Sequence, residues 1–262
     1  MIKGFRCTCG EAVPFADCLK RARSHPDDCP FVYPILQGMA NGIRGEVEGI
    51  SVTSMLGCLR KAALDRRHDA YVDPKQLYHA FRGQLFHALA DLGRPEGCIV
   101  EQRFARSIAG LTISGQPDLI WPEHQLLIDF KSTRRAPPKE PYPHHALQVN
   151  LYRWLIEPVH KVDRLEIVYL DMEGARRLPV PLMERRRVVA TLVARARPLG
   201  AALAGGRLPA RVGPEGIWQC NWCPFPDRCW PGGIPTRDEL RRRQESRLKA
   251  IRRARDQCGS LG

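Results

Sequence analysis

The sequence predicts an α/β fold, in which a mixed β-sheet is flanked by helices and preceded by a small metal-binding module. Two observations predict this fold. Apolar residues recur at helical spacing in four segments, 51–63, 77–92, 145–156 and 184–204. Five other segments read as strands bounded by turn residues: 99–108, 111–121, 125–132, 165–172 and 177–182. Helices that alternate with strands in this order cover the faces of a sheet.

Residues 1–35 are expected to form a separate zinc module. A tight knuckle at Cys7-Thr8-Cys9-Gly10 precedes a helix from Phe15 to Ser24. Three thiolates and one imidazole make a tetrahedral zinc set, here Cys7, Cys9, His25 and Cys29, with Cys18 as a spare candidate. So small a unit has little core, so metal binding and folding should be one event. The alternative is a helical hairpin with ordinary buried cysteines.

The rest of the chain divides into three parts. Residues 36–50 carry glycine and little periodicity, and they read as a linker. Residues 51–235 hold the predicted sheet domain, and the segment Ser51-Val52-Thr53-Ser54 offers hydroxyls to cap its first helix. Residues 236–262 read as a basic C-terminal helix, which is either a solvated charged face or a surface that contacts nucleic acid.

Composition indicates a polyanionic partner. The formal net charge is +13, from 41 Lys and Arg against 28 Asp and Glu. Such an excess attracts nucleic acid, because binding releases its counterions; a basic protein without that role is the alternative. The sequence contains neither an apolar run of membrane-spanning length nor a secretory leader, so we expect a cytoplasmic protein with no membrane partner. In a reducing compartment its ten cysteines read as metal ligands rather than disulfides.

A carboxylate–lysine pattern carries the predicted chemistry. Asp129 and Lys131 share one face of the third strand, and Asp118 lies toward the end of the second. If these strands pair, the two carboxylates and the backbone carbonyl of Phe130 form an oxygen cage suited to Mg²⁺ or Mn²⁺. The metal would polarise a phosphodiester and lower the pKa of a bound water. Lys131 could orient that water, deprotonate it or stabilise the transition state.

Three further polar residues fit the same site. His87, on the helix before the strands, could be a third metal ligand through its imidazole. Gln148 and Tyr152 are four residues apart on the next helix, so they share a face and could touch substrate or hold Lys131. Taken alone, each of these residues is more often structural.

In this order, the motifs resemble the RecB-like branch of the PD-(D/E)xK nuclease superfamily, over Ser51 to Trp230. The matching elements are Gly83-x-x-x-His87, Gly115-x-Pro117-Asp118, Asp129-x-Lys131 and Gln148-x-x-x-Tyr152. The resemblance implies a restriction-endonuclease-like fold and a metal-dependent deoxyribonuclease. Its catalytic residues would be Asp118, Asp129, Lys131, Gln148 and Tyr152.

Cys58 and the later Cys220-x-x-Cys223-x5-Cys229 resemble the iron–sulfur-binding subset of that branch. This subset includes the CRISPR-associated exonuclease and AddB-type nuclease domains. The resemblance implies that these four cysteines hold a [4Fe–4S] cluster, which would act as a structural staple. A four-cysteine zinc site has the same number of ligands.

The expected substrate is DNA, single-stranded or with free ends, and the expected protein partners belong to recombination or CRISPR adaptation. The front module and the basic tail depart from the compact CRISPR-associated form, so repair, recombination or a mobile element fits equally. Two other hypotheses are a non-catalytic nucleic-acid-binding module that retains the nuclease fold, and a zinc-rich regulator.

Overall fold

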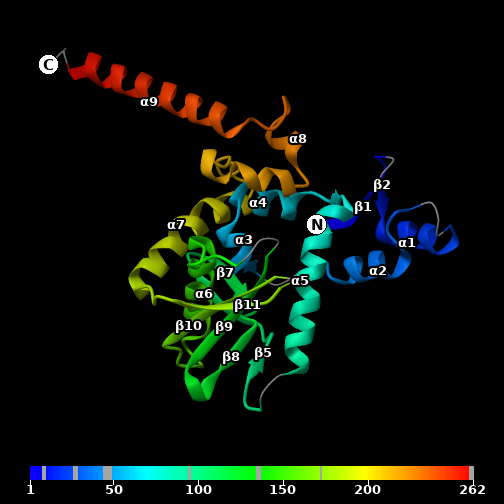
Figure 1. Cartoon of the computed structure of the whole chain (residues 1–262). Helices are drawn as coiled ribbons and strands as arrows, with labels where there is room; N and C mark the ends of the chain where they lie inside the picture. Colours follow the sequence, from blue (N-terminus) through cyan, green and yellow to red (C-terminus); the bar gives the residue numbers. More distant parts are fainter. Residues whose placement is uncertain are drawn as a thin grey trace. The chain divides into compact units, whose positions relative to one another are not determined.

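The computed structural model describes residues 1–7, 10–25, 29–43, 49–93, 96–133, 137–171 and 173–259. Within the helices, the side chains of residues 79, 86, 87, 89–91 and 252–259 lie outside the description. The chain divides into two compact units, Met1–Pro209 and Ala210–Gly262, and each is treated by itself. Figure 1 labels the elements of both.

The predicted mixed sheet is confirmed in the first unit (Figure 1). Its five strands have the order β11-β10-β9-β8-β5. Only β9 and β10 are parallel; the other neighbouring pairs are antiparallel. These strands are β5 (Ile99–Val100), β8 (Leu119–Trp121), β9 (Leu126–Ser132), β10 (Arg164–Leu170) and β11 (Ala175–Val180). A second sheet has the order β3-β7-β6 and contains β3 (Ile50–Ser51), β6 (Phe104–Ile108) and β7 (Leu111–Gly115).

Two segments predicted as single strands are each divided between the two sheets. The segment 99–108 breaks after β5 at Glu101, whose φ is 47°, a left-handed conformation that ends a strand. The segment 111–121 breaks at Gln116-Pro117, because proline has no N–H to continue the ladder. Asp118 therefore lies directly before β8, at the point where the chain enters the larger sheet.

Five helices of the first unit correspond to the four segments of predicted apolar periodicity. The first predicted helix is divided into α3 (Val52–Leu56) and α4 (Leu59–Arg67), because the backbone is extended at Gly57. The Ser51 hydroxyl caps α3 by accepting the Ser54 N–H at 3.0 Å. The helices α5 (Pro74–Leu92), α6 (Pro143–Ile156) and α7 (Arg185–Leu203) lie within a few residues of the predicted bounds.

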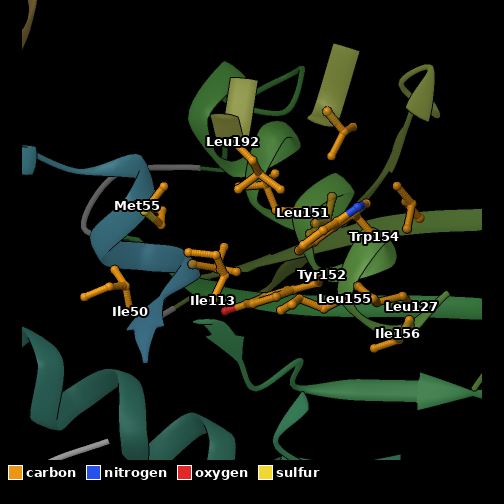
Figure 2. Packing of buried hydrophobic residues seen from close by; sticks show 14 of the residues in the cluster. Ile50, Met55, Ile113, Leu127, Leu151, Tyr152, Trp154, Leu155, Ile156 and Leu192 are labelled. Atoms are coloured by element: carbon orange, nitrogen blue, oxygen red, sulfur yellow. The ribbon is translucent and has the colours of Figure 1, made fainter. Parts of the chain in front are cut away.

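The main core lies between α6, α7 and the strands. Helix α6 contributes most to it, because eight of the nine positions from Gln148 to Ile156 are buried, all except Arg153. Figure 2 shows Leu155 and Ile156 beside Leu127 of β9, and the Tyr152 ring among them with its hydroxyl directed away from Leu155. The core therefore fixes the helix that carries two of the predicted site residues.

The front of the chain differs from the predicted separate module and linker. Helix α1 (Phe15–Ser24) is as predicted, but β1 (Ile2–Arg6) pairs with β2 (Ala12–Pro14) and, in parallel, with β4 (Ala70–Val72). Helix α2 (Tyr33–Asn41) crosses the predicted module boundary at residue 35 and occupies part of the expected 36–50 linker. Its Leu36 and Met39 are buried in a second, smaller core, which the sequence analysis did not predict.

The second unit consists of η3 (Pro214–Trp222), α8 (Pro226–Cys229) and α9 (Arg237–Gly259). The expected basic helix is present as α9, and Glu215 of η3 forms ion pairs with its Arg237 and Arg241. Residues 210–235 thus belong with the tail, whereas the sequence placed the domain boundary at 235. In the part of the chain that the structure describes, no helix is long and apolar enough to span a membrane.

Substitution of Gly115 tests how α6 packs on β7. A Cβ at this position would lie 2.7 Å from Leu155 Cδ1 and 2.8 Å from the Tyr152 ring. We expect Gly115→Ala to lower the free energy of unfolding by about 1–3 kcal/mol, as overpacked cores do. Urea unfolding followed by circular dichroism measures this change.

Gly200→Ala is the matched control for Gly115→Ala. Its Cβ would meet Leu111 of the same core at an ordinary 3.7 Å. Because alanine favours a helix over glycine by roughly 1 kcal/mol, this variant should be as stable as the native chain or more so. Equal stability of Gly115→Ala and the native chain would contradict the described packing.

Candidate active site

Strand pairing brings the two predicted carboxylates together. Leu119 of β8 is paired with Ile128 of β9, and the antiparallel register continued by one residue places Asp118 opposite Asp129. Asp118 Oδ2 accepts the backbone N–H of Phe130 at 2.6 Å. Lys131 Nζ lies 2.6 Å from Asp129 Oδ2. The acid, acid and lysine of the two motifs thus form one cluster.

Lys131 is held as a cation in this cluster. The Asp129 side chain is 1% exposed and that of Lys131 is 21% exposed. Burial alone would lower the lysine pKa, but the negative charges of Asp129 and Asp118 outweigh burial and raise it. A lysine of raised pKa keeps its proton at neutral pH. It is therefore suited to neutralise developing negative charge rather than to accept a proton.

Gln148 and Tyr152 reach the same cluster from α6. Gln148 Nε2 donates to the Tyr152 hydroxyl at 2.8 Å, and both side chains are buried. Burial raises the pKa of Tyr152, and the charge of Asp129 raises it further, so the phenol stays neutral. The Tyr152 ring packs directly on Gly115, where a larger side chain would collide with it. This contact explains why the second motif contains a glycine at this position.

Two residues that the sequence analysis did not single out, Arg103 and Glu101, form hydrogen bonds with Gln116, the second residue of the Gly115-x-Pro117-Asp118 motif. Arg103 Nη2 donates to Gln116 Oε1 at 2.8 Å, and Gln116 Nε2 donates to Glu101 Oε2 at 3.4 Å. The Glu101 N–H also donates to the Asp118 carbonyl at 3.2 Å. Glu101 and Arg103 lie in the bend between β5 and β6, outside any helix or strand. The periodicity of the sequence therefore could not have indicated them.

Histidines at the start of α6 also lie near Lys131 and were missed. His145 Nδ1 is 3.0 Å from the hydroxyl of Tyr169, the residue of β10 paired with Lys131. Burial, then the charge of Lys131, then His144, lower the pKa of His145 to about 3. Burial and Lys131 lower the pKa of His144 as well. In the sequence, two adjacent histidines one turn before Gln148 could have indicated that this end of the helix lies near the site.

Helix α5 lies along the end of β9. Arg82 Nη2 donates to the Thr133 carbonyl at 3.2 Å, and a Cβ at Gly83 would lie 3.6 Å from Ser132 Oγ. The glycine of the first motif is therefore next to the strand that carries Asp129 and Lys131. The side chain of His87, one turn later, lies outside the described residues, so its role as a metal ligand stays a prediction.

The donor set fits a small hard cation. Asp118 and Asp129 offer carboxylate oxygens and Phe130 a backbone carbonyl, the ligands that Mg²⁺ and Mn²⁺ prefer. Among the described residues, no group of three or more His, Cys, Asp and Glu side chains could hold a metal ion. Two carboxylates nevertheless suit Mg²⁺, which keeps several waters and takes substrate phosphate oxygens as ligands.

The predicted cluster cysteines lie in two units. Cys58 caps α4 in the first unit, where its Sγ accepts the Lys61 N–H at 3.4 Å. Cys220 and Cys223 lie at the end of η3, and Cys229 ends α8 in the second unit. Because each unit is described by itself, a cluster of the four stays a prediction.

Three of the four predicted zinc ligands line one cavity in the front of the chain. Cys7, His25 and Cys29 surround a space of about 370 Å³ together with Cys18, the spare candidate. Burial raises the pKa of Cys18, and the neighbouring Cys29 and Cys7 raise it further. The remaining predicted ligand, Cys9, lies outside the described residues.

The low pKa of His145 makes a prediction for stability. The folded value of about 3 is below the ordinary 6.5, so as pH falls through this window the unfolded chain takes up a proton that the folded chain refuses. Unfolding should therefore become easier from pH 7 to pH 5. Urea titrations in EDTA should show a smaller loss for His145→Gln than for the native chain. Equal losses would contradict a half-buried, neutral imidazole beside Lys131.

Comparison with known proteins identifies the superfamily of the chain. The model of the PD-(D/E)XK nuclease superfamily matches residues 60–230. The crystal structure of SSO0001 aligns with a TM-score of 0.53 and 19% identity, covering 73% of this chain and 91% of that one. A phage-related exonuclease from Haemophilus somnus aligns with a TM-score of 0.41 and 12% identity, over 61% and 93%. No curated protein matches the sequence. The superfamily model covers well over half of the chain, and the chain belongs to the PD-(D/E)XK nuclease superfamily.

Proposed function

We propose that this protein is a divalent-metal-dependent deoxyribonuclease of the RecB-like branch, which hydrolyses phosphodiester bonds in single-stranded DNA or at DNA ends. The observation that carries the proposal is the position of Asp118 opposite Asp129, with Lys131 Nζ 2.6 Å from Asp129. The superfamily and the net charge of +13 support a nucleic-acid substrate.

Each residue of the cluster has a role in this proposal. Asp118 and Asp129 would hold the Mg²⁺ or Mn²⁺, with the carbonyl of Phe130, and the bound ion would supply an activated water and polarise the phosphate. Lys131, kept protonated by the two carboxylates, neutralises the charge that develops on the phosphate. Tyr152, held by Gln148, packs beside the cluster and excludes water from its inner side.

Asp129→Asn and Lys131→Met should each slow cleavage by about 100- to 1000-fold or more, because each removes a charge that acts on the transition state. The measurement is digestion of end-labelled single- and double-stranded DNA with Mg²⁺ or Mn²⁺. Asp65→Asn and Lys61→Ala are the controls, since they break another Asp–Lys pair, 2.5 Å apart, on α4. These two variants should cut at the native rate.

Native-rate cleavage by Asp129→Asn would contradict the assignment of the active site. A native chain that binds DNA but cuts neither substrate with either metal would instead support the alternative, a non-catalytic binding module with a nuclease fold. The products of the digestion also report whether cutting begins at ends.

We also propose that Cys58, Cys220, Cys223 and Cys229 ligate a [4Fe–4S] cluster. Cys58 and Cys229 carry free thiols. The surroundings of Cys58 suit a metal-bound sulfur: its Sγ accepts the Lys61 N–H at 3.4 Å, and the guanidinium of Arg195 lies within electrostatic range. Hydrogen bonds and positive charge of this kind stabilise sulfur ligands.

A zinc ion in the front cavity is the third part of the proposal. The proposed ligands are Cys7, Cys9, His25 and Cys29; Cys7, His25 and Cys29 line the cavity together with Cys18, the spare candidate. The N–H of Phe31 donates to Cys29 Sγ at 3.5 Å. The biological setting proposed is DNA repair, recombination, a mobile element or CRISPR adaptation, with the proteins of that setting as partners.

Metal analysis of the full chain separates the two cysteine sites. Protein purified without oxygen should be brown and contain both iron and zinc. Cys58→Ser should lose iron and keep zinc, whereas Cys29→Ser should lose zinc and keep iron. Cys98→Ser, in neither set, should keep both. Colourless protein with zinc and no iron would contradict the cluster, and brown protein without zinc would contradict the front site.

A further inference from the structure

An aromatic group surrounds the start of α6, next to the catalytic cluster. The ring of Tyr142 lies 5.9 Å from that of His144 at an interplanar angle of 22°, a stacked pair. Tyr169 packs edge-on against Tyr142, with centroids 5.8 Å apart and planes at 85°. His145 lies 5.6 Å from Tyr142, also edge-on. None of these rings has a role in the chemistry proposed above.

Hydrogen bonds fix this group to the strand beside Lys131. The Tyr142 N–H donates to the Tyr169 hydroxyl at 3.0 Å, and the same hydroxyl forms a hydrogen bond of 3.0 Å with His145 Nδ1. Tyr169 is itself paired with Lys131 in the β9–β10 ladder. The stacked pair is therefore held in one place relative to the lysine rather than carried by a loose loop.

The two stacked rings are open to solvent on their outer side. Tyr142 is 45% exposed, and His144 is also exposed, whereas Tyr169 below them is fully buried. An exposed aromatic pair on a rigid support offers a flat face next to a site for phosphate chemistry. Nucleobases of single strands bind such faces by stacking, which contributes about 1–3 kcal/mol per base.

We propose that Tyr142 and His144 form a stacking platform for an unpaired base next to the scissile phosphate. The inference rests on the proposed nuclease function and deepens it, because it names the part of the substrate that this face recognises. In a duplex the base faces are already stacked on their neighbours, so a duplex must unpair before it can use the platform. The platform thus favours single strands or frayed ends.

The test measures binding of the full chain to a short single-stranded oligonucleotide in EDTA, which leaves the DNA intact. A 2-aminopurine is placed at each position in turn, because stacking on an aromatic ring quenches its fluorescence. Native protein should quench at one or two adjacent positions. Tyr142→Ala should abolish that quenching and weaken binding by roughly 5- to 150-fold, the range that corresponds to one stacked base.

Three variants serve as controls. Tyr142→Trp should retain quenching and affinity, and His144→Ala should reduce both in part. Tyr78→Ala removes another tyrosine that is also 45% exposed, on α5, and should change neither. Tyr142→Ala leaves the backbone hydrogen bond to Tyr169 in place, so circular dichroism should report a native fold.

Cleavage kinetics distinguish failure of the stacking platform from failure of the proposed nuclease function. With Mn²⁺, Tyr142→Ala should raise KM for single strands more than it lowers kcat, and should change duplex cleavage less. Native quenching and KM in Tyr142→Ala, in a protein that cuts DNA, would overturn the platform and leave the nuclease intact. A native chain that cuts no DNA would overturn the nuclease, whatever the quenching shows.

Discussion

The site depends on burying the Asp129 carboxylate, 1% exposed, at the centre of a sheet. An isolated carboxylate in such a place would cost several kcal/mol, so it needs a cation and hydrogen-bond donors nearby. Lys131 supplies the cation from two residues along the same strand, and Asp118 is fixed opposite by the Phe130 N–H. The same arrangement that makes the charges tolerable brings two carboxylates and an ammonium within reach of one phosphate.

The elements around this pair act as its supports. β10 lies parallel to β9 and places Tyr169 beside Lys131, while β8 lies antiparallel to β9 and places Asp118 beside Asp129. Helix α6 covers both through Tyr152, whose ring reaches the cluster only because Gly115 has no side chain. The packing of Tyr152 on Gly115 therefore leaves little room for a side chain at the centre of the site.

The sequence predicted the centre of the molecule better than its ends. β9 follows from an unbroken apolar run that leads into Asp129, and the alternation of a strand is enough to place Lys131 on the same face. The shared helical face of Gln148 and Tyr152 was equally direct. By contrast, β1, β2 and β4 are only three to five residues long, too short to show a clear periodic pattern. They form because they pair with one another rather than because of their own composition.

Two kinds of information were missing from the sequence. The strands containing Glu101 and Pro117 read as continuous, because alternation does not report a left-handed residue, and their halves join different sheets. The neutral histidines were also hidden, since only burial beside Lys131 lowers their pKa. The adjacency of Tyr142 and His144 to the cluster arises from the β9–β10 register, which no local pattern predicts.

The central claim is that Asp118 and Asp129 together form a divalent-metal site, and its most direct measurement is a Mn²⁺ titration followed by electron paramagnetic resonance. The native chain should remove Mn²⁺ from solution in a saturable manner, and Mg²⁺ should compete for it. Asp118→Asn and Asp129→Asn, each folded by circular dichroism, should each weaken that binding by tenfold or more, a loss of about 1.4 kcal/mol. Native Mn²⁺ binding in both variants would contradict the account, because the carboxylates would then hold no metal.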